Sequence, residues 1–156
     1  MGINFTLSEI QRKAKNYCTY QERSHNEVIK KLYSFGLRKA DVDQTLSWLI
    51  ESDYLNEERF AIRFAGGKFR MKKWGRIKLR QALLQHKIST YNIIIALENI
   101  DETAYMKTLQ RLASVKWHSL KTDTLLIKKM KTTRYLLQKG YERQLIKQVI
   151  HELTVP

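Results

Sequence analysis

The sequence predicts an all-α fold: an elongated, right-curved array of three tandem three-helix repeats. Apolar residues make up 43% of the 156 residues and recur almost everywhere at intervals of three and four, which is the period of an amphipathic helix. The alternation of apolar and polar residues that would predict strands is scarce, and the chain contains one proline. Three segments with a shared pattern then predict the repeats.

The three segments share a set of apolar positions and a turn. They are Val28–Leu49, Leu79–Ile100 and Thr132–Leu153. Gly36, Lys87 and Gly140 occupy the same place in them, at offsets of 51 and 53 residues. The apolar residues that coincide are Leu32, Leu83 and Leu136; Leu37, Ile88 and Tyr141; Val42, Ile93 and Ile146; Leu46, Leu97 and Ile150; and Leu49, Ile100 and Leu153. Repeats of this kind bury their apolar faces against their neighbours.

The first repeat indicates how one unit is built. A helix that carries Leu32 ends at Gly36, because glycine adopts the left-handed conformation of a helix end without a Cβ penalty. After a short polar turn, a second helix places Val42, Leu46 and Leu49 at positions i, i+4 and i+7 of one face. The chain before each such pair has room for one more helix, so a repeat holds three helices in about 50 residues.

Helix-start signals set the predicted repeat boundaries. Asn56, followed by two glutamates, is typical of an N-cap with acidic residues in the first helical turn, and Asp101-Glu102 is the corresponding signal of the third repeat. The predicted domains are therefore residues 1–55, which include an N-terminal segment, residues 56–100 and residues 101–156.

Positive charge is concentrated after the first repeat. The chain has a net charge of +14, yet residues 1–58 hold eight basic and nine acidic residues, whereas residues 59–156 hold 21 basic and six acidic ones. No carboxylate occurs from Arg59 to Leu97. A surface that only keeps a protein soluble mixes both signs, so the asymmetry indicates a binding face for nucleic acid or an acidic protein.

The densest basic stretch is FAGGKFRMKKWGRIKLR, from Phe64 to Arg80. Lys72, Arg76 and Arg80 are spaced four apart, so a helix would display them on one face, and Lys68 extends that row if the helices are continuous.

The same stretch holds an aromatic residue and two glycines. Trp74 can stack on a base, although packing is the more common role of such a residue. Gly66-Gly67 permits a bend or close packing. A phosphate loop is excluded, because no strand precedes Gly66-Gly67-Lys68 and no Ser or Thr follows it.

The sequence contains no recognisable catalytic or metal-binding motif. The four histidines are far apart, no His-x₃-His or Cys-x₂-Cys spacing occurs, and the carboxylates fall mostly at helix starts or on polar faces. Cys18 is alone, as expected for a buried apolar residue in a reducing cytoplasm. We therefore expect a cytoplasmic protein with no enzyme activity, cofactor or metal.

Membrane attachment is not expected. The longest apolar run, Ile93–Leu97, is far shorter than the roughly 20 residues that span a bilayer. Gly2 and Thr6 fit the short myristoylation pattern, which arises easily by chance.

Four motifs occur in order along nearly the whole chain, from about Ser8 to Leu153. They are Arg23-Ser24-x-x-Glu27-Val28-x-x-Lys31-Leu32 with Gly36; Tyr54-Leu55-Asn56-Glu57-Glu58-Arg59-Phe60-Ala61-x-x-Phe64; Trp74-Gly75-Arg76-Ile77-x-Leu79-x-x-x-Leu83 with Ile88; and Leu136-Leu137-x-x-Gly140-Tyr141-Glu142. Together they resemble the repeat signatures of the RecX family, the regulators of the RecA recombinase. Two positions depart from the family pattern, since Asn56 stands where the family often has Asp and Lys87 where it often has Gly.

The resemblance implies three tandem three-helix repeats and a protein that lies in the groove of the RecA–single-stranded-DNA filament. There it would bridge neighbouring protomers, restrain filament growth, and lower ATP hydrolysis and strand exchange. The expected partners are the RecA filament and single-stranded DNA, with double-stranded DNA as a further candidate, and neither a membrane nor a small-molecule substrate. Candidate contact residues are Arg23, Lys31, Arg63, Lys68, Arg70, Lys72, Lys73, Trp74, Arg76, Lys78, Arg80, Lys128, Lys129, Lys131 and Arg134.

Two other interpretations stay open. A helical regulator could act on bare DNA without RecA, with a helix of a segment such as Val28–Leu49 in the major groove. The equivalent helices of the first and third repeats carry different charges, however, so no single recognition helix stands out. A helical scaffold could instead bind an acidic protein with no role for nucleic acid.

Overall fold

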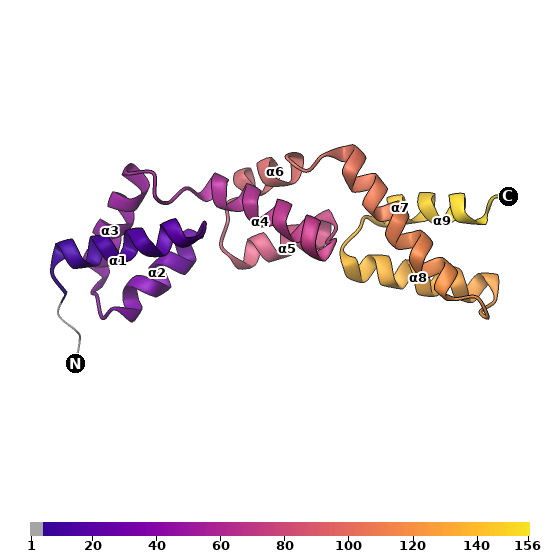
Figure 1. The fold of residues 1–156 in the computed structure, drawn as a ribbon, viewed down its shortest axis with the longest axis horizontal. Helices are drawn as coiled ribbons and strands as arrows, with labels where there is room; N and C mark the ends of the chain where they lie inside the picture. Colours follow the sequence, from indigo (N-terminus) through magenta and orange to yellow (C-terminus); the bar gives the residue numbers. More distant parts are fainter. Residues whose placement is uncertain (1–4) are drawn as a thin grey trace. The chain divides into compact units, whose positions relative to one another are not determined.

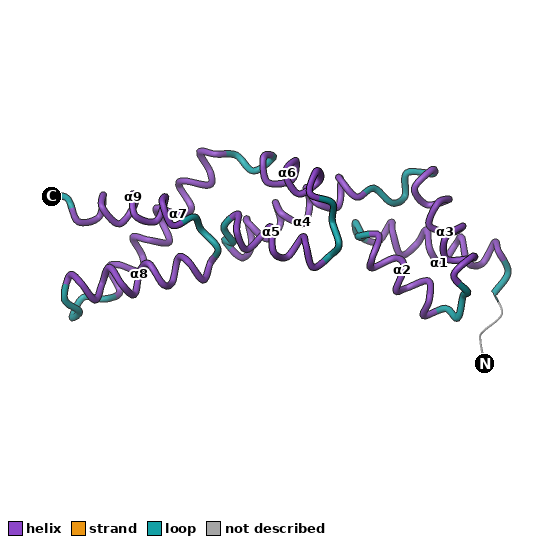
Figure 2. The backbone as a smooth tube through the Cα atoms, turned by 180° about the vertical axis from the view of Figure 1, so that it is seen from behind, coloured by secondary structure: helices purple, strands orange, loops and turns teal. Residues whose placement is uncertain are grey.

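The computed structural model describes residues 5–156, and these form nine α-helices and no strand (Figures 1 and 2). The helices are α1 (Leu7–Tyr20), α2 (His25–Ser34), α3 (Lys39–Glu51), α4 (Glu57–Lys72), α5 (Arg76–Gln85), α6 (Thr90–Glu98), α7 (Glu102–Ser119), α8 (Leu125–Lys139) and α9 (Arg143–Thr154). The predicted all-α helical-repeat fold is confirmed. Gly2, which begins the short lipidation pattern, lies outside the described residues.

Side-chain caps explain why several helices begin where they do. Ser24 and Glu27 form a reciprocal capping box at the start of α2. The Oδ1 atom of Asn56 accepts a hydrogen bond from the backbone N–H of Arg59 at 2.9 Å, so the predicted cap of α4 is confirmed. The carboxylate of Asp101 accepts an N–H three residues on at 2.8 Å, which caps α7 as expected.

The turn that the three repeats share has the same backbone conformation in each of them. Gly36, Lys87 and Gly140 follow α2, α5 and α8 with φ angles of 83°, 63° and 97°. The apolar residues that come next in the second and third turns, Ile88 and Tyr141, are buried, and each donates its N–H to the carbonyl five residues back at 3.2 Å. Lys87 therefore adopts a left-handed conformation that costs a residue with a Cβ about 1 kcal/mol.

The coincident apolar positions form the interior of the repeats. Leu32, Leu83 and Leu136 have no exposed surface. Nine further members of the aligned set are buried, namely Ile88, Tyr141, Val42, Ile93, Ile146, Leu49, Leu97, Ile100 and Ile150. The apolar period in the sequence therefore identified core residues.

The chain divides into two compact units, and the division passes through the middle repeat. Unit 1 comprises the chain up to Phe64 together with Leu83–Ile95, and unit 2 comprises Ala65–Ala82 together with Ala96–Pro156. Helices α4, α5 and α6 thus each contribute residues to both units.

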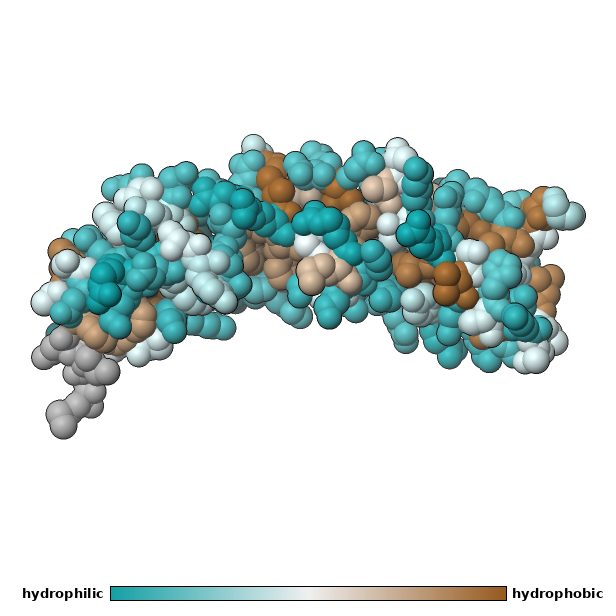
Figure 3. Space-filling model, in the orientation of Figure 1, coloured by the Kyte–Doolittle hydropathy of each residue, from teal (hydrophilic) through white to brown (hydrophobic). Residues whose placement is uncertain are grey.

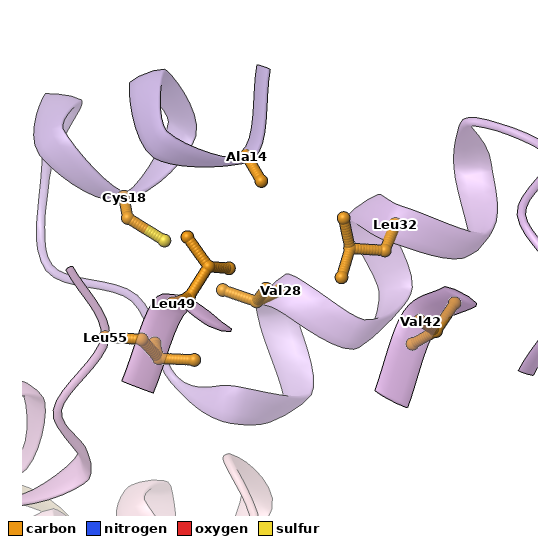
Figure 4. Close-up of a cluster of buried hydrophobic side chains, with 7 residues drawn as sticks. All are labelled: Ala14, Cys18, Val28, Leu32, Val42, Leu49 and Leu55. Carbon is orange, nitrogen blue, oxygen red and sulfur yellow. The ribbon is translucent and has the colours of Figure 1, made fainter. Parts of the chain in front are cut away.

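The core of unit 1 is centred on α1, α2 and α3, which pack against one another. Its buried cluster consists of Ala14, Cys18, Val28, Leu32, Val42, Leu49 and Leu55 (Figure 4). Arg59, in the first turn of α4, joins this core through its Nε atom, which lies 2.6 Å from a carboxylate oxygen of Glu22. Its guanidinium also lies 3.2 Å from the carboxylate of Asp53.

The core of unit 2 is centred on α7, α8 and α9, which also pack against one another. Tyr105 and Tyr141 are fully buried, with their ring centroids 5.1 Å apart. Phe69, from the last part of α4, stacks on Tyr105 with a centroid distance of 5.8 Å. An aromatic column therefore joins the end of α4 to the third repeat.

The expectation of a bend or close packing at Gly66-Gly67 is wrong. Both glycines lie inside α4, which continues without interruption to Lys72. A Cβ added to Gly67 would meet no atom within 4 Å, and one added to Gly66 would meet only the flexible side chain of Arg70. Close packing occurs instead at Gly75, in the turn that follows α4.

Candidate functional site

The basic stretch spans two helices and the turn between them. Helix α4 ends at Lys72, Lys73 takes a left-handed conformation with φ of 61°, and α5 begins at Arg76. The expectation that a helix displays Lys72, Arg76 and Arg80 together on one face is therefore wrong, because a turn separates Lys72 from the other two. The row is divided between two helices: Lys68 and Lys72 lie four residues apart in α4, and Arg76 and Arg80 lie four apart in α5.

Two glycines hold this turn against the end of α8. The N–H of Gly75 donates to the carbonyl of Lys139 at 2.7 Å, and the N–H of Ile77 donates to the carbonyl of Gly140 at 2.9 Å. A Cβ on Gly75 would lie 2.6 Å from the backbone nitrogen of Tyr141 and closer still to the carbonyl of Gly140. The two backbones therefore touch, and this contact fixes the start of α5 on the third repeat.

Lysine and tyrosine side chains reinforce the same contact. The Nζ atom of Lys139 donates to the carbonyl of Lys72 at 3.1 Å, and the hydroxyl of Tyr141 donates to the carbonyl of Lys73 at 2.8 Å. The Nζ atom of Lys73 donates to the carbonyl of Arg70 at 2.8 Å. These donors satisfy carbonyls at the negative end of α4, where a helix lacks internal partners.

Arg76 is committed to the interior of unit 2. Its guanidinium pairs with Glu142, at 2.7 Å, and with Glu102, and it lies 3.8 Å from the ring centroid of Tyr105. The backbone N–H of Arg76 donates to the hydroxyl of Tyr105 at 2.9 Å, and that hydroxyl donates to Glu142. Only 23% of the Arg76 side chain is exposed, so its charge serves mainly to hold the third repeat.

The burial of this network shifts its ionisation. Burial raises the pKa of Tyr105, and the hydrogen bond to Glu142 raises it further. Burial likewise raises the pKa of Tyr141. Burial alone would lower the pKa of Arg76, but the hydrogen bond and charge of Glu142 raise it. All three groups therefore keep their protons at neutral pH.

Five other cations of the stretch make no ion pair within the described residues: Arg70, Lys72, Lys73, Lys78 and Arg80. Arg70, Lys72, Lys73 and Arg80 are exposed, and Lys78 is half-buried. Since Arg76 takes up two of the six carboxylates of unit 2, the remaining cations lack a local counter-charge. We refer to these five residues as the basic surface.

Trp74 lies in the turn between α4 and α5 and is half-buried. The Nζ atoms of Lys68 and Lys78 lie 5.3 and 4.8 Å from its ring centroid. The ring is therefore in cation–π contact with Lys68 and with Lys78, which is a member of the basic surface.

The four candidate cations of α8 fall into two groups, two that contact a neighbouring side chain and two that make no ion pair. Lys131 pairs with Asp123 at 3.0 Å, and Lys128 lies 4.7 Å from the ring centroid of Trp117. Lys129 and Arg134 make no ion pair within the part of the chain that the structure describes.

The three candidates in unit 1 are separate from this group. The Nε atom of Arg23 donates to the carbonyl of Tyr17 at 2.9 Å, and its guanidinium stacks on the Tyr17 ring at 3.8 Å. Lys31 lies 5.4 Å from the same ring centroid. Both therefore pack on α1. Arg63 is exposed on α4 and has no ion pair among the described residues.

Sequence reasoning missed Tyr105, Glu142 and Lys139, which organise the turn. Each resembles an ordinary helix-surface or core residue in the linear sequence, and their partners lie 29 to 67 residues away. The one available signal for these residues was the last of the four motifs, in which Glu142 directly follows Gly140-Tyr141.

Metal binding, thiol chemistry and membrane insertion find little support in the described part of the chain. No group of three or more His, Cys, Asp or Glu residues there could hold a metal ion. Cys18 is buried, and burial raises its pKa to about 11, so its thiol is protonated and unreactive near neutral pH. None of the described helices is both long and apolar enough to cross a membrane.

Comparison with known proteins identifies the repeats. The family description "RecX, second three-helix domain" matches residues 56–97, and "RecX, third three-helix domain" matches residues 103–150. Solved structures share the fold. The crystal structure of RecX from Lactobacillus salivarius has a TM-score of 0.87 at 24% identity and covers 94% of this chain and 96% of that one. A second structure, of a regulatory protein RecX, has a TM-score of 0.80 at 20% identity, covering 92% and 72%.

Curated relatives carry the same name. "Regulatory protein RecX" of Clostridium perfringens (strain 13) is 28% identical over 135 residues, which are 85% of this chain and 62% of that protein. The Bacillus mycoides protein is 25% identical over 148 residues, 93% of this chain and 55% of the relative. The Chlorobium phaeobacteroides protein is 29% identical over 133 residues, 85% of each. The chain thus spans less than two thirds of the first two relatives. Because the two family matches cover more than half of its residues, the chain belongs to the RecX family.

Proposed function

We propose that this protein regulates the RecA recombinase by binding in the groove of the RecA–single-stranded-DNA filament. In that position it lowers ATP hydrolysis, filament extension and strand exchange, and it acts in the cytoplasm as a binding protein rather than an enzyme. Membership of the RecX family supports RecA as the partner.

The basic surface is the observation that carries the proposal. Its five cations lack ion pairs within the described residues, and the glycine contact with α8 holds the turn that displays them. A DNA strand or an acidic protein patch supplies the missing counter-charge, and release of counterions favours that contact at low salt. The lower net charge of unit 1 suits contact with protein more than with phosphate.

The test is a titration of this protein into RecA that hydrolyses ATP on single-stranded DNA. We expect inhibition at substoichiometric to equimolar amounts. Binding to bare single-stranded and bare duplex DNA is measured in parallel by fluorescence anisotropy. Unchanged ATPase would contradict the proposal, and tight, sequence-selective duplex binding would favour a regulator that acts on bare DNA.

A further inference from the structure

We propose that α8 carries a second binding site, a groove that accepts an acidic amphipathic helix of a partner protein. The groove has a volume of about 580 Å³ and is lined by Lys129, Met130, Thr133, Arg134, Leu137 and Gln138. It is distinct from the basic surface, and the proposal does not rest on RecA being the partner.

The floor of the groove is an apolar stripe that the fold does not cover. Met130, Thr133 and Leu137 line the groove, and Leu126, one helical turn before Met130, extends the stripe beyond it; the four residues fall within roughly 60° of one another around α8. Leu126 is 68% exposed and Met130 is 54% exposed, although both belong to an ordered helix. Hydrophobic patches interrupt the hydrophilic surface in the part of Figure 3 where α7, α8 and α9 are drawn. An uncovered apolar stripe of this kind is typical of a binding surface.

Positive charge borders the stripe. Lys129 and Arg134 both line the groove and make no ion pair within the described residues. The other two α8 cations are engaged elsewhere, Lys131 with Asp123 and Lys128 with the ring of Trp117. None of the 15 residues of α8 is acidic.

This combination selects one class of occupant. A nucleic acid would satisfy the two cations but would place charged phosphates beside the apolar stripe, which is unfavourable. A second copy of this chain would bring another strongly basic unit, since unit 2 holds 18 basic and six acidic residues. An amphipathic helix with apolar residues at i, i+4 and i+7 and carboxylates on its flanks satisfies both features.

The length of the stripe sets the size of the partner segment. From Leu126 to Leu137 the helix rises by roughly 16 Å, which corresponds to about three turns of a partner helix. Three apolar anchors, spaced over two turns, would cover the exposed parts of Leu126, Met130 and Leu137.

The natural methionines allow a direct test with the unmodified chain. Labelling with [ε-¹³C]methionine gives one methyl signal in the groove, from Met130, and one from Met71, which is 82% exposed beside the basic surface. The probe is a synthetic 14-residue peptide with leucines at i, i+4 and i+7, glutamates at the flanking positions and alanines on the opposite face, which favour the helix and avoid repulsion between neighbouring carboxylates. A peptide of the same composition, permuted so that the leucines do not share a face, is the control.

We expect the amphipathic peptide to shift the Met130 signal at concentrations that leave Met71 unchanged, and oligo(dT) to shift Met71 first. Leu126→Glu should weaken peptide binding by at least about tenfold, because it removes an apolar anchor and adds a like charge. Val115→Glu, a change at an equally exposed apolar residue of α7, should alter it by less than about twofold.

Three results would overturn the proposal. They are equal binding of the permuted peptide, a Met130 signal that only oligo(dT) or anionic vesicles perturb, and a Met130 shift that depends on protein concentration alone, which would indicate self-association. Inhibition of RecA is measured separately, so these results can refute the peptide site on α8 without refuting the proposed function.

Discussion

The two units are nearly equal in length but differ in how they use charge. Unit 1 holds 11 basic and nine acidic residues, and unit 2 holds 18 and six. In unit 1, Glu22, Asp53, Glu27 and Asp43 all lie in ion pairs. In unit 2, the ion pairs within the described residues involve only two cations, Arg76 and Lys131. Both units are built from helices of the same kind of three-helix repeat. The surplus positive charge of unit 2 is therefore not needed for folding and is available for binding.

Within unit 2, the basic stretch that ends at Arg80 contains residues that hold the fold and residues that face solvent. Gly75 and Arg76 anchor the turn, whereas Arg70, Lys72 and Arg80 are exposed. Substitutions that separate stability from binding test this division, and they are ordered below by expected effect.

The largest effect is expected at Gly75. Gly75→Ala places a Cβ against the backbone of Gly140 and Tyr141, so we expect the free energy of unfolding to fall by about 3 kcal/mol. Gly67→Ala is the matched control, because its Cβ meets nothing within 4 Å and alanine favours the helix by about 1 kcal/mol. Urea denaturation of both variants measures the difference. A Gly75→Ala variant as stable as the parent chain would contradict the backbone contact.

Arg76 should matter more for stability than for binding. Arg76→Met leaves Glu142 and Glu102 without their partner and should lower the free energy of unfolding by about 2 kcal/mol. Arg80→Met, four residues on and exposed, should change it by less than about 0.5 kcal/mol. The account of the network fails if the two variants unfold at the same urea concentration.

A smaller effect, a gain in stability, is expected at the turn of the second repeat, which lies in unit 1. Lys87 has a φ of 63° where the other two repeats have glycine. Lys87→Gly should therefore raise the free energy of unfolding by up to about 1 kcal/mol, whereas Gly36→Ala, at the equivalent turn of the first repeat with a φ of 83°, should lower it by a similar amount. Destabilisation by Lys87→Gly would show that the lysine side chain contributes more than its backbone conformation costs.

Alkaline pH should weaken the two units in sequence. Folding raises the pKa of Cys18 to about 11 and also raises the pKa values of Tyr105 and Tyr141, so the folded state holds these protons more tightly than the unfolded chain. The stabilisation is complete below the unfolded pKa values and is lost as the pH rises, first above about 9 for the thiol and then above about 10 for the tyrosines. Cys18→Ala should flatten the decline in stability between pH 9 and 10, as measured by urea denaturation at several pH values. An unchanged decline would exclude the thiol as its cause.

Much of the fold could be predicted from the sequence, because it depends on local patterns. The apolar period identified core residues such as Leu83, and the N-cap at Asn56 fixed the start of α4. The left-handed turn at Lys87 was found by alignment with two glycines, even though the residue itself gives no such signal.

For the candidate site, the sequence predicts which residue types are present but not which contacts they make. The sequence places Arg76 among cations of equal appearance, and its partner Glu142 lies 66 residues away, so only the tertiary contact distinguishes it. Gly75 belongs to one of the four motifs, but the motif does not reveal its close contact, because a close approach of backbones depends on where α8 ends. Long-range packing, which the sequence does not display, decides which charges remain available.

One measurement tests the central claim that the exposed cations of unit 2 bind the filament. RecA ATPase on single-stranded DNA is titrated with Arg70→Glu/Lys72→Glu/Arg80→Glu and with Arg12→Glu/Lys30→Glu/Arg38→Glu. The second variant makes the same charge change at exposed cations of unit 1 that form no ion pair with any residue that the structure describes. Circular dichroism checks that both variants keep their helices. We expect the first variant to need at least about tenfold more protein for half-inhibition and the second to behave like the parent chain. Equal inhibition by the two variants would contradict the account.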